Sequence, residues 1–219
     1  MDYWRQLDVL NPRKLASTHI TIIGAGGICS PTALALAKMG APSLSIYDAD
    51  TVEDHNLPNQ LYRLDDIGKH KVCALQEILT SFSDCDTTVH PEHFTQQRVE
   101  PGIVISGVDS MKARREIFNK LRYSPSVSLY VEARMGAQVS RIYTLNPCSP
   151  MDVEWYEGDM LYSDEEALPE KCTEKAIIYN VFFIAALIAN QVKKYVCEEP
   201  YARELIGDLA TLTLMHGDG

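Results

Sequence analysis

A glycine-rich segment near the start of the chain has the residue types needed to bind a phosphate group. Gly24, Gly26 and Gly27 lie in the sequence GAGGIC, which nearly matches the G-x-G-x-x-G pattern of dinucleotide-binding proteins. Glycines let backbone N–H groups approach an anion, and the N-terminus of a following helix adds a favourable partial charge. Cys29 replaces the third glycine, and we expect it to serve packing rather than catalysis. The turn therefore predicts a nucleotide site.

Two acidic residues follow the glycine turn at the end of the next strand pattern. In Rossmann-type sites an acid about 20 residues after the turn binds the ribose hydroxyls, and Asp48 is the candidate for this role. Asp50 projects to the same side of an extended chain. An acid at a strand end is also often only solvated, and this alternative applies more strongly to Asp50.

The segments that must position these residues alternate between strand and helix patterns. We expect strands over 20–23, 43–50, 87–90, 103–106, 127–131 and 138–145, with helices over 33–39, 71–82, 111–121 and 174–196, and an edge strand within 210–215. This alternation predicts an α/β fold of the Rossmann-like class: a mostly parallel sheet with helices on both faces and a C-terminal antiparallel extension. We expect one domain over residues 1–219, with an N-terminal segment at 1–17 and a long polar loop at 146–172.

Composition and charge exclude several classes of protein. The 219 residues are 46% hydrophobic and 23% charged, which is ordinary for a globular protein. The net charge of -10 argues against binding to nucleic acid. The six cysteines form no C-x-x-C pair, so we expect neither a disulfide framework nor zinc. The sequence shows no signal peptide, and its longest apolar stretch, 177–189, is too short to cross a membrane, so we expect a cytoplasmic protein.

A series of short motifs continues beyond the glycine turn, in DADTVEDHNLPNQLYRLDDIGKHKV. Their order resembles the nucleotide site of the ThiF/MoeB/HesA family, whose fold is shared with ubiquitin-activating enzymes. The family pattern runs from the glycine turn to D-x-D-x-V, then N-L-x-R-Q, then D-I-G-x-x-K. The residues of this chain that match it are Asp48, Asp50, Val52, Asn56, Leu57, Gln60, Asp66, Ile67, Gly68 and Lys71.

The resemblance implies a function and a role for each site residue. The implied reaction is ATP- and Mg²⁺-dependent adenylation of the C-terminal carboxylate of a ubiquitin-like or sulfur-carrier protein with a glycine tail. Such a reaction needs local cations, because a carboxylate must approach a triphosphate. The implied nucleotide contacts are Gly24, Gly26, Gly27, Asp48, Asp50, Asn56, Gln60, Arg63 and Lys71. The implied catalytic residues are Lys71, Asp109, Arg5 and Cys172.

Three of these residues carry specific implications. Asp109 stands where the family places its magnesium-associated aspartate. Arg5 matches a family arginine that reaches the ATP phosphates of a neighbouring subunit, which implies a homodimer. Cys172 lies where several members carry a cysteine on a crossover loop. Lysines and a helix N-terminus near this thiol would lower its pKa, which favours a thioester intermediate on Cys172. Some family members transfer the adenylate without a cysteine intermediate, so the resemblance leaves both routes open.

One departure from the family pattern keeps other functions open. Asn59 replaces the arginine of N-L-x-R-Q, and Arg63 is the candidate to supply the missing cation. If it does not, the chain is a non-catalytic scaffold that keeps the fold and binds nucleotide. A nicotinamide-dependent oxidoreductase is the third hypothesis, and it is supported only by the glycine turn and Asp48.

Overall fold

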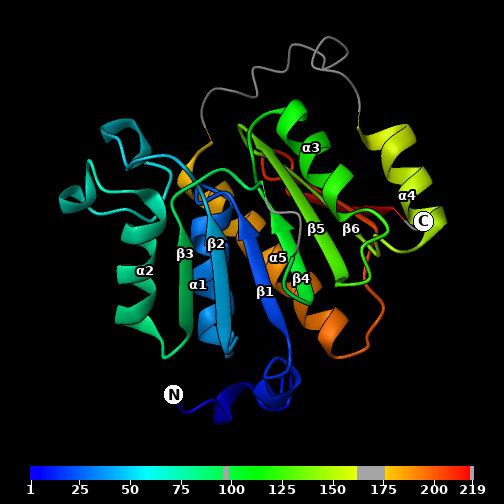
Figure 1. Ribbon diagram of the computed structural model, residues 1–219, viewed down its shortest axis with the longest axis horizontal. Coiled ribbons are helices and arrows are strands. Elements are labelled where there is room, and N and C mark those ends of the chain that lie inside the picture. Colours follow the sequence, from blue (N-terminus) through cyan, green and yellow to red (C-terminus); the bar gives the residue numbers. More distant parts are fainter. Residues whose placement is uncertain (96–98, 162–175, 218–219) are drawn as a thin grey trace.

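A computed structural model describes residues 1–95, 99–161 and 176–217, and its centre is a twisted sheet (Figure 1). Within these ranges the sheet has eight strands in the order β3-β2-β1-β4-β5-β6-β7-β8. The strands from β3 to β5 in that order are parallel, and β6, β7 and β8 add in antiparallel fashion. Their bounds are β1 His19–Ile23, β2 Ser43–Tyr47, β3 Asp86–His90, β4 Gly102–Ser106, β5 Val127–Gly136, β6 Val139–Leu145, β7 Glu204–Asp208 and β8 Thr213–Gly217. The predicted fold class is confirmed.

Helices cover both faces of the sheet (Figure 1). One face packs against α1 (Cys29–Met39), α2 (Lys71–Phe82) and α5 (Ile178–Val196). The other packs against α3 (Met111–Leu121) and α4 (Pro150–Trp155), which a π-helical turn, Tyr156–Met160, extends. Short 3-10 turns occupy Trp4–Gln6, Pro12–Lys14, Asp54–Asn56 and Leu64–Asp66.

The inner parallel strands β1, β2 and β4 are buried on both sides, which explains their nearly continuous apolar sequences. Side chains alternate along each strand, so Ile20 and Ile22 of β1 contact the α1 side while Ile23 contacts the α3 side. The same alternation places Val104 of β4 and Tyr130 of β5 on the α3 side. Two apolar cores therefore hold the sheet, one on each face.

The chain reverses direction across the sheet between β1 and β4. From β1 it passes to β2 and β3 on one side, and it then returns to β4 on the other side of β1. Such a switch point leaves a crevice outside the carboxyl ends of the strands, where ligands bind in open α/β sheets. The glycine turn follows β1 and the segment that contains Asp109 follows β4, so both lie at this point.

The segment 146–172 is not an irregular loop throughout, and this part of the prediction is wrong. Residues 150–160 are helical because the Ser149 hydroxyl caps the Asp152 amide and Pro150 occupies the first turn. Val153 and Tyr156 then bury their side chains in the core on the α3 side. This helix is too short for its apolar residues to show a clear helical periodicity, so the sequence did not reveal it. The second half of the segment lies outside the described residues.

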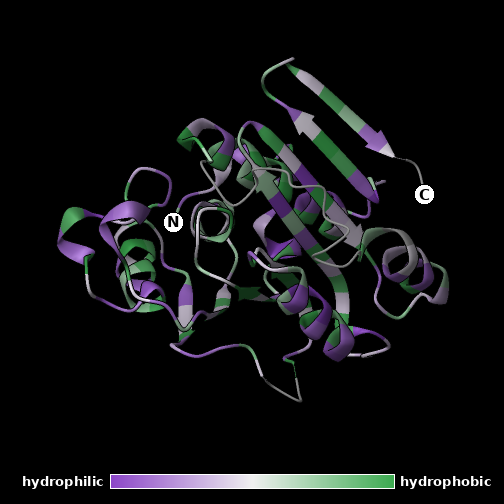
Figure 2. Ribbon diagram, turned by 90° about the horizontal axis from the view of Figure 1, so that it is seen from above, coloured by the Kyte–Doolittle hydropathy of each residue, from purple (hydrophilic) through white to green (hydrophobic). Residues whose placement is uncertain are grey.

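The C-terminal part differs from expectation in one further way. The predicted edge strand is present as β8, but it is the second arm of a hairpin whose first arm, β7, was not predicted. Figure 2 shows this hairpin at the margin of the sheet, with hydrophilic and hydrophobic residues alternating along it. Among the described residues, no helix has both the length and the apolar character that a membrane span requires.

Candidate functional site

The glycine turn is held by hydrogen bonds to both backbone groups of one residue, Ala25. The Ala25 N–H donates to Asp48 Oδ2 at 2.6 Å, and the Tyr62 hydroxyl donates to the Ala25 carbonyl at 2.5 Å. Gly24 has a φ of 96°, a conformation that favours glycine. By contrast, the N–H groups of Gly26 and Gly27 donate to no other group in the part of the chain that the structure describes. A rigid turn with two available donors at a helix N-terminus is suited to bind an anion.

Asp48, Asp50 and Lys71 lie together beside this turn. The two Asp48 oxygens accept from the amides of Ala25 and Asp50, which fixes the carboxylate at the end of β2. The Lys71 ammonium donates to Asp50 Oδ2 at 2.7 Å, and the Lys71 amide donates to the Asp50 carbonyl. The Lys71 side chain is only 9% exposed, whereas that of Asp50 is 63% exposed. A positive charge is therefore held in place near the glycine turn.

The segment with Asn56, Asn59 and Gln60 borders the turn from another side. A Cβ on Gly27 would lie 2.9 Å from the Asn59 carbonyl oxygen, so the two backbones are in close contact. The Asn56 side chain is buried and accepts from the Glu53 amide, so it stabilises its own 3-10 turn. The side-chain oxygens of Asn59 and Gln60 are buried and accept no hydrogen bond in the described structure. These two acceptors are suited to hydroxyl or amino groups of a ligand.

Asp109 lies on the segment after β4, directly across the switch point from the glycine turn. A Cβ on Gly24 would lie 3.2 Å from the Gly107 carbonyl oxygen, so the two segments touch. Cys29 fills the space beside Gly107, and burial raises the pKa of its thiol to about 12, as expected for a packing residue. The Asp109 carboxylate is exposed and has no hydrogen bond or ion pair with the described residues.

The guanidinium of Arg63 is already bonded to acidic side chains. It bonds to both oxygens of the buried Asp66 carboxylate and to Glu77, and Lys69 binds the same two acids. The Arg63 hydrogen bonds lower the pKa of Asp66 to about 2. This network joins the segment 63–69 to α2. For Arg63 to replace the missing family arginine, these bonds would have to break.

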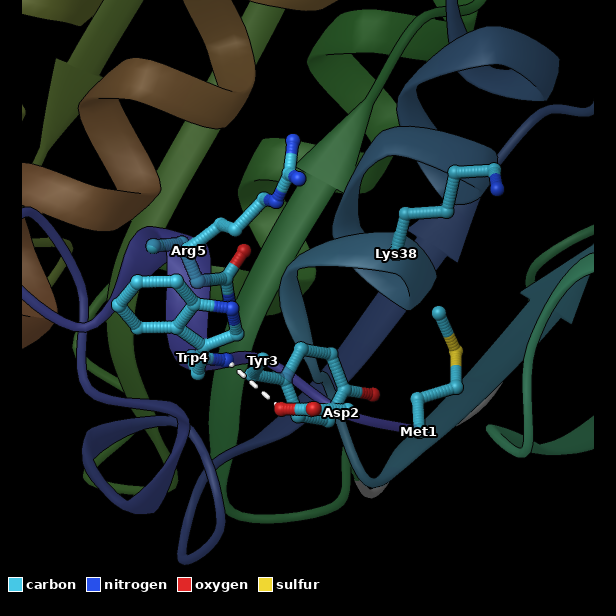
Figure 3. Close-up of a pocket in the computed structure, with 7 residues that line it drawn as sticks. Met1, Asp2, Tyr3, Trp4, Arg5 and Lys38 are labelled. Carbon is cyan, nitrogen blue, oxygen red and sulfur yellow. Dashed lines mark hydrogen bonds between the residues drawn. The ribbon is translucent and has the colours of Figure 1, made fainter.

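Arg5 and Cys172 are not placed with the other residues. Arg5 lies in the N-terminal segment, where Gln6 bonds to the Met39 carbonyl at the far end of α1. Whereas the glycine turn follows the carboxyl end of β1, Figure 1 shows this terminus near the amino ends of the parallel strands. There, residues 1–6 and Lys38 line a pocket of 330 Å³, in which the Arg5 side chain points away from Asp2 (Figure 3). Within one chain, Arg5 therefore does not reach the crevice, and Cys172 lies outside the described residues.

Three residues at the site escaped the sequence analysis. Tyr62 clamps the glycine turn, while Arg114 on α3 and Glu132 on β5 form a buried ion pair beside the Asp109 segment. Two signals could have revealed the pair. Arg114 shares a helix face with the apolar Met111, Ile117 and Phe118, and Glu132 interrupts an apolar strand. Opposite charges at two buried positions predict that they meet.

Comparison with known proteins identifies relatives of this chain. The model of the ThiF family matches residues 3–218. The adenylyltransferase and sulfurtransferase uba4 of Aspergillus clavatus is 40% identical over 94 residues, which are 42% of this chain and 19% of that protein. The NEDD8-activating enzyme E1 catalytic subunit of Drosophila melanogaster is 38% identical over 118 residues, 48% of this chain and 26% of that protein. The matches thus span about a fifth to a quarter of these relatives.

Solved structures share the fold at low sequence identity. The structure of E. coli MccB with MccA-N7isoASN has a TM-score of 0.75 and 19% identity, over 94% of this chain and 66% of that chain. MccB has also been solved with ATP; that structure has a TM-score of 0.71 and 17% identity, over 94% of this chain and 65% of that chain. These similarities establish a shared architecture.

Proposed function

Because the chain belongs to the ThiF family, we propose that it adenylates the C-terminal carboxylate of a ubiquitin-like or sulfur-carrier protein. In this reaction a carboxylate oxygen bonds to the α-phosphorus of ATP, the bond from that phosphorus to the bridging oxygen breaks, and pyrophosphate leaves. One observation carries the proposal: the unpaired amides of the glycine turn, the Lys71 ammonium and the Asp109 segment meet at the switch point.

The chain's own groups have separable tasks in this proposal. The amides of Gly26 and Gly27 and the Lys71 ammonium bind the phosphates, and Lys71 exchanges its bond with Asp50 for one with a phosphate oxygen. Asp48 retains its bond to the turn while its remaining lone pairs accept from ribose hydroxyls. The buried acceptor on Gln60 is available to a donor of the nucleoside. These contacts orient the α-phosphate for attack and stabilise the leaving pyrophosphate.

The residues at the crevice also fit a magnesium ion bound together with ATP. Mg²⁺ usually binds through one or two carboxylates plus the phosphates of the substrate. Asp109 supplies one exposed carboxylate, and the described residues contain no cluster of three or more acidic, His or Cys ligands. The ion, when bound through Asp109, neutralises charge on the phosphates.

The proposal assigns Arg5 and Cys172 to later or shared steps. Because Arg5 lies near the C-terminal end of α1, whereas the glycine turn precedes the N-terminus of that helix, the proposal has Arg5 act on the phosphates bound by a second copy of the chain, in a homodimer. Cys172 is proposed as an optional acceptor: its thiolate attacks the acyl carbonyl of the adenylate and AMP leaves.

Exchange of labelled pyrophosphate into ATP tests this function. The protein is incubated with ATP, Mg²⁺ and candidate carriers from its genomic neighbourhood. We expect exchange with at least one carrier, its loss in Asp109→Ala, and its retention in Cys172→Ala. A conjugate that is sensitive to reductant and absent from Cys172→Ala would show the thioester step. Lack of exchange with every carrier would count against adenylation.

A non-catalytic scaffold is the second candidate, and a specific observation favours it. Asn59 replaces the family arginine, and Arg63 is engaged with Asp66 and Glu77. A scaffold binds ATP in calorimetry but releases no pyrophosphate with any carrier. The oxidoreductase hypothesis has no support beyond the glycine turn and Asp48, and it leaves the family match over 3–218 unexplained.

A further inference from the structure

A buried charge cluster lies directly behind the segment that carries Asp109. The Glu132 carboxylate on β5 is fully buried and pairs with Arg114 from α3 and with Arg134 two residues along the strand. The hydroxyl of Tyr156 donates to the same carboxylate at 3.1 Å. Burial raises the pKa of Tyr156, which keeps this phenol protonated as a donor. The cluster thus joins β5, α3 and the end of α4.

Such a cluster is a costly way to hold a fold together. Buried ion pairs lose hydration, and apolar side chains of similar volume often stabilise a core equally well. Here two guanidinium groups share one carboxylate. Arg114 is 5% exposed, and its position on a buried helix face requires the Glu132 partner. A role in fixing the position of the neighbouring backbone accounts for the lost hydration, which packing alone does not explain.

Two further hydrogen bonds of Arg114 show which backbone segments it holds in position. One guanidinium nitrogen donates to the Ala133 carbonyl of β5 at 2.9 Å, and another donates to the Val108 carbonyl. Val108 immediately precedes Asp109. On the other side, the Ser110 hydroxyl caps α3 by accepting from the Ala113 amide at 3.2 Å. The backbone is therefore fixed before and after Asp109, while the Asp109 side chain remains exposed.

We propose that Arg114 is a positioning residue that ties the Asp109 segment to β5, and that Glu132 orients Arg114 for this task. Neither residue contacts substrate in this account. The inference rests on the proposed function, in which Asp109 meets the magnesium ion bound with ATP. The planar guanidinium fork matters here, because a lysine keeps the charge but cannot hold two carbonyls and a carboxylate in one fixed arrangement.

Calorimetric titration with ATP, in the presence and absence of Mg²⁺, tests the proposal without knowledge of the carrier. The readout is the ratio of the two dissociation constants, which reports how much Mg²⁺ strengthens ATP binding; this ratio is the magnesium benefit. We expect Asp109→Asn to abolish this benefit. We expect Arg114→Lys to reduce it by about tenfold while the affinity for ATP without Mg²⁺ stays within about twofold of the wild type. A merely structural role would change both affinities together.

Controls separate the possible failures. Arg115→Lys alters the neighbouring arginine, which donates to the Leu161 carbonyl, and should change neither affinity. Glu132→Gln should follow Arg114→Lys, and it decides the question if the latter does not fold. An unchanged magnesium ratio in folded Arg114→Lys overturns the inference even when Asp109→Asn behaves as expected. If the wild type binds no ATP, the proposed function fails with it.

Discussion

Replacing Lys71 by methionine isolates the contribution of the ammonium that Asp50 holds beside the glycine turn. The Lys71 side chain is 9% exposed and unbranched, so methionine fills most of its space without the charge. A hydrogen bond to a charged group contributes about 1.5–3 kcal/mol. Loss of the ammonium should therefore weaken ATP binding by roughly 10- to 150-fold.

The same substitution should change folding stability only slightly. Asp50, the partner of Lys71 in the free protein, is 63% exposed, so its carboxylate remains solvated after the ammonium is removed. Ion pairs with one exposed partner contribute about 0–1 kcal/mol. We therefore expect Lys71→Met to melt within a few degrees of the wild type while its ATP affinity drops.

Two further variants complete the experiment, with affinity measured by calorimetry and melting by differential scanning fluorimetry. Asp50→Asn releases Lys71 and removes a negative charge, so ATP affinity should stay the same or increase. Lys38→Met changes a lysine at the C-terminal end of α1, where the N-terminal pocket lies, and should not change the affinity for ATP. If folded Lys71→Met binds ATP within twofold of the wild type, or if Lys38→Met weakens binding equally, the assignment of Lys71 is wrong.

Two predictions concern the segments that frame the site. Asp66→Asn should lower the free energy of unfolding by about 1–2 kcal/mol in urea titrations, because Arg63 and Lys69 lose a buried acceptor but are themselves partly exposed. Since the pKa of Asp66 is lowered to about 2, the wild type should lose this stabilisation as pH falls from about 4 to 2, and Asp66→Asn should not. Tyr62→Phe leaves the Ala25 carbonyl without its donor, so ATP affinity should fall by about two- to tenfold, and an unchanged affinity would show that the turn does not need this clamp.

Local sequence patterns predicted the parallel half of the sheet well. The apolar runs of β1, β2 and β4 are buried on both faces; the glycine turn follows β1, and a helix begins at Met111 shortly after β4. The short helix at 150–160 was concealed because it is capped by Ser149 within a segment rich in acids and prolines. Strand β7 was missed because only Leu205 and Gly207 of its five residues are buried.

The sequence predicted those site residues that are close together in the chain or belong to a known motif. Asp48 and Lys71 follow ordered motifs, and the fold brings both to the glycine turn. The contacts of Arg63 with Glu77 and of Arg114 with Glu132 are tertiary: patterns in the sequence mark Arg114 and Glu132 as buried charges, but the distances that join each pair come from the fold. The sequence therefore indicated the candidate groups for nucleotide binding, whereas the groups that hold these candidates in position were identified only from the fold.

A structure of the protein bound to a non-hydrolysable ATP analogue with Mg²⁺ tests the central claim most directly. We predict phosphate oxygens within about 3 Å of the amides of Gly26 and Gly27 and of the Lys71 ammonium, with Asp109 on the same side of the nucleotide. An analogue bound elsewhere, for example in the pocket formed by residues 1–6 and Lys38, or phosphates that contact none of these groups, would contradict the account.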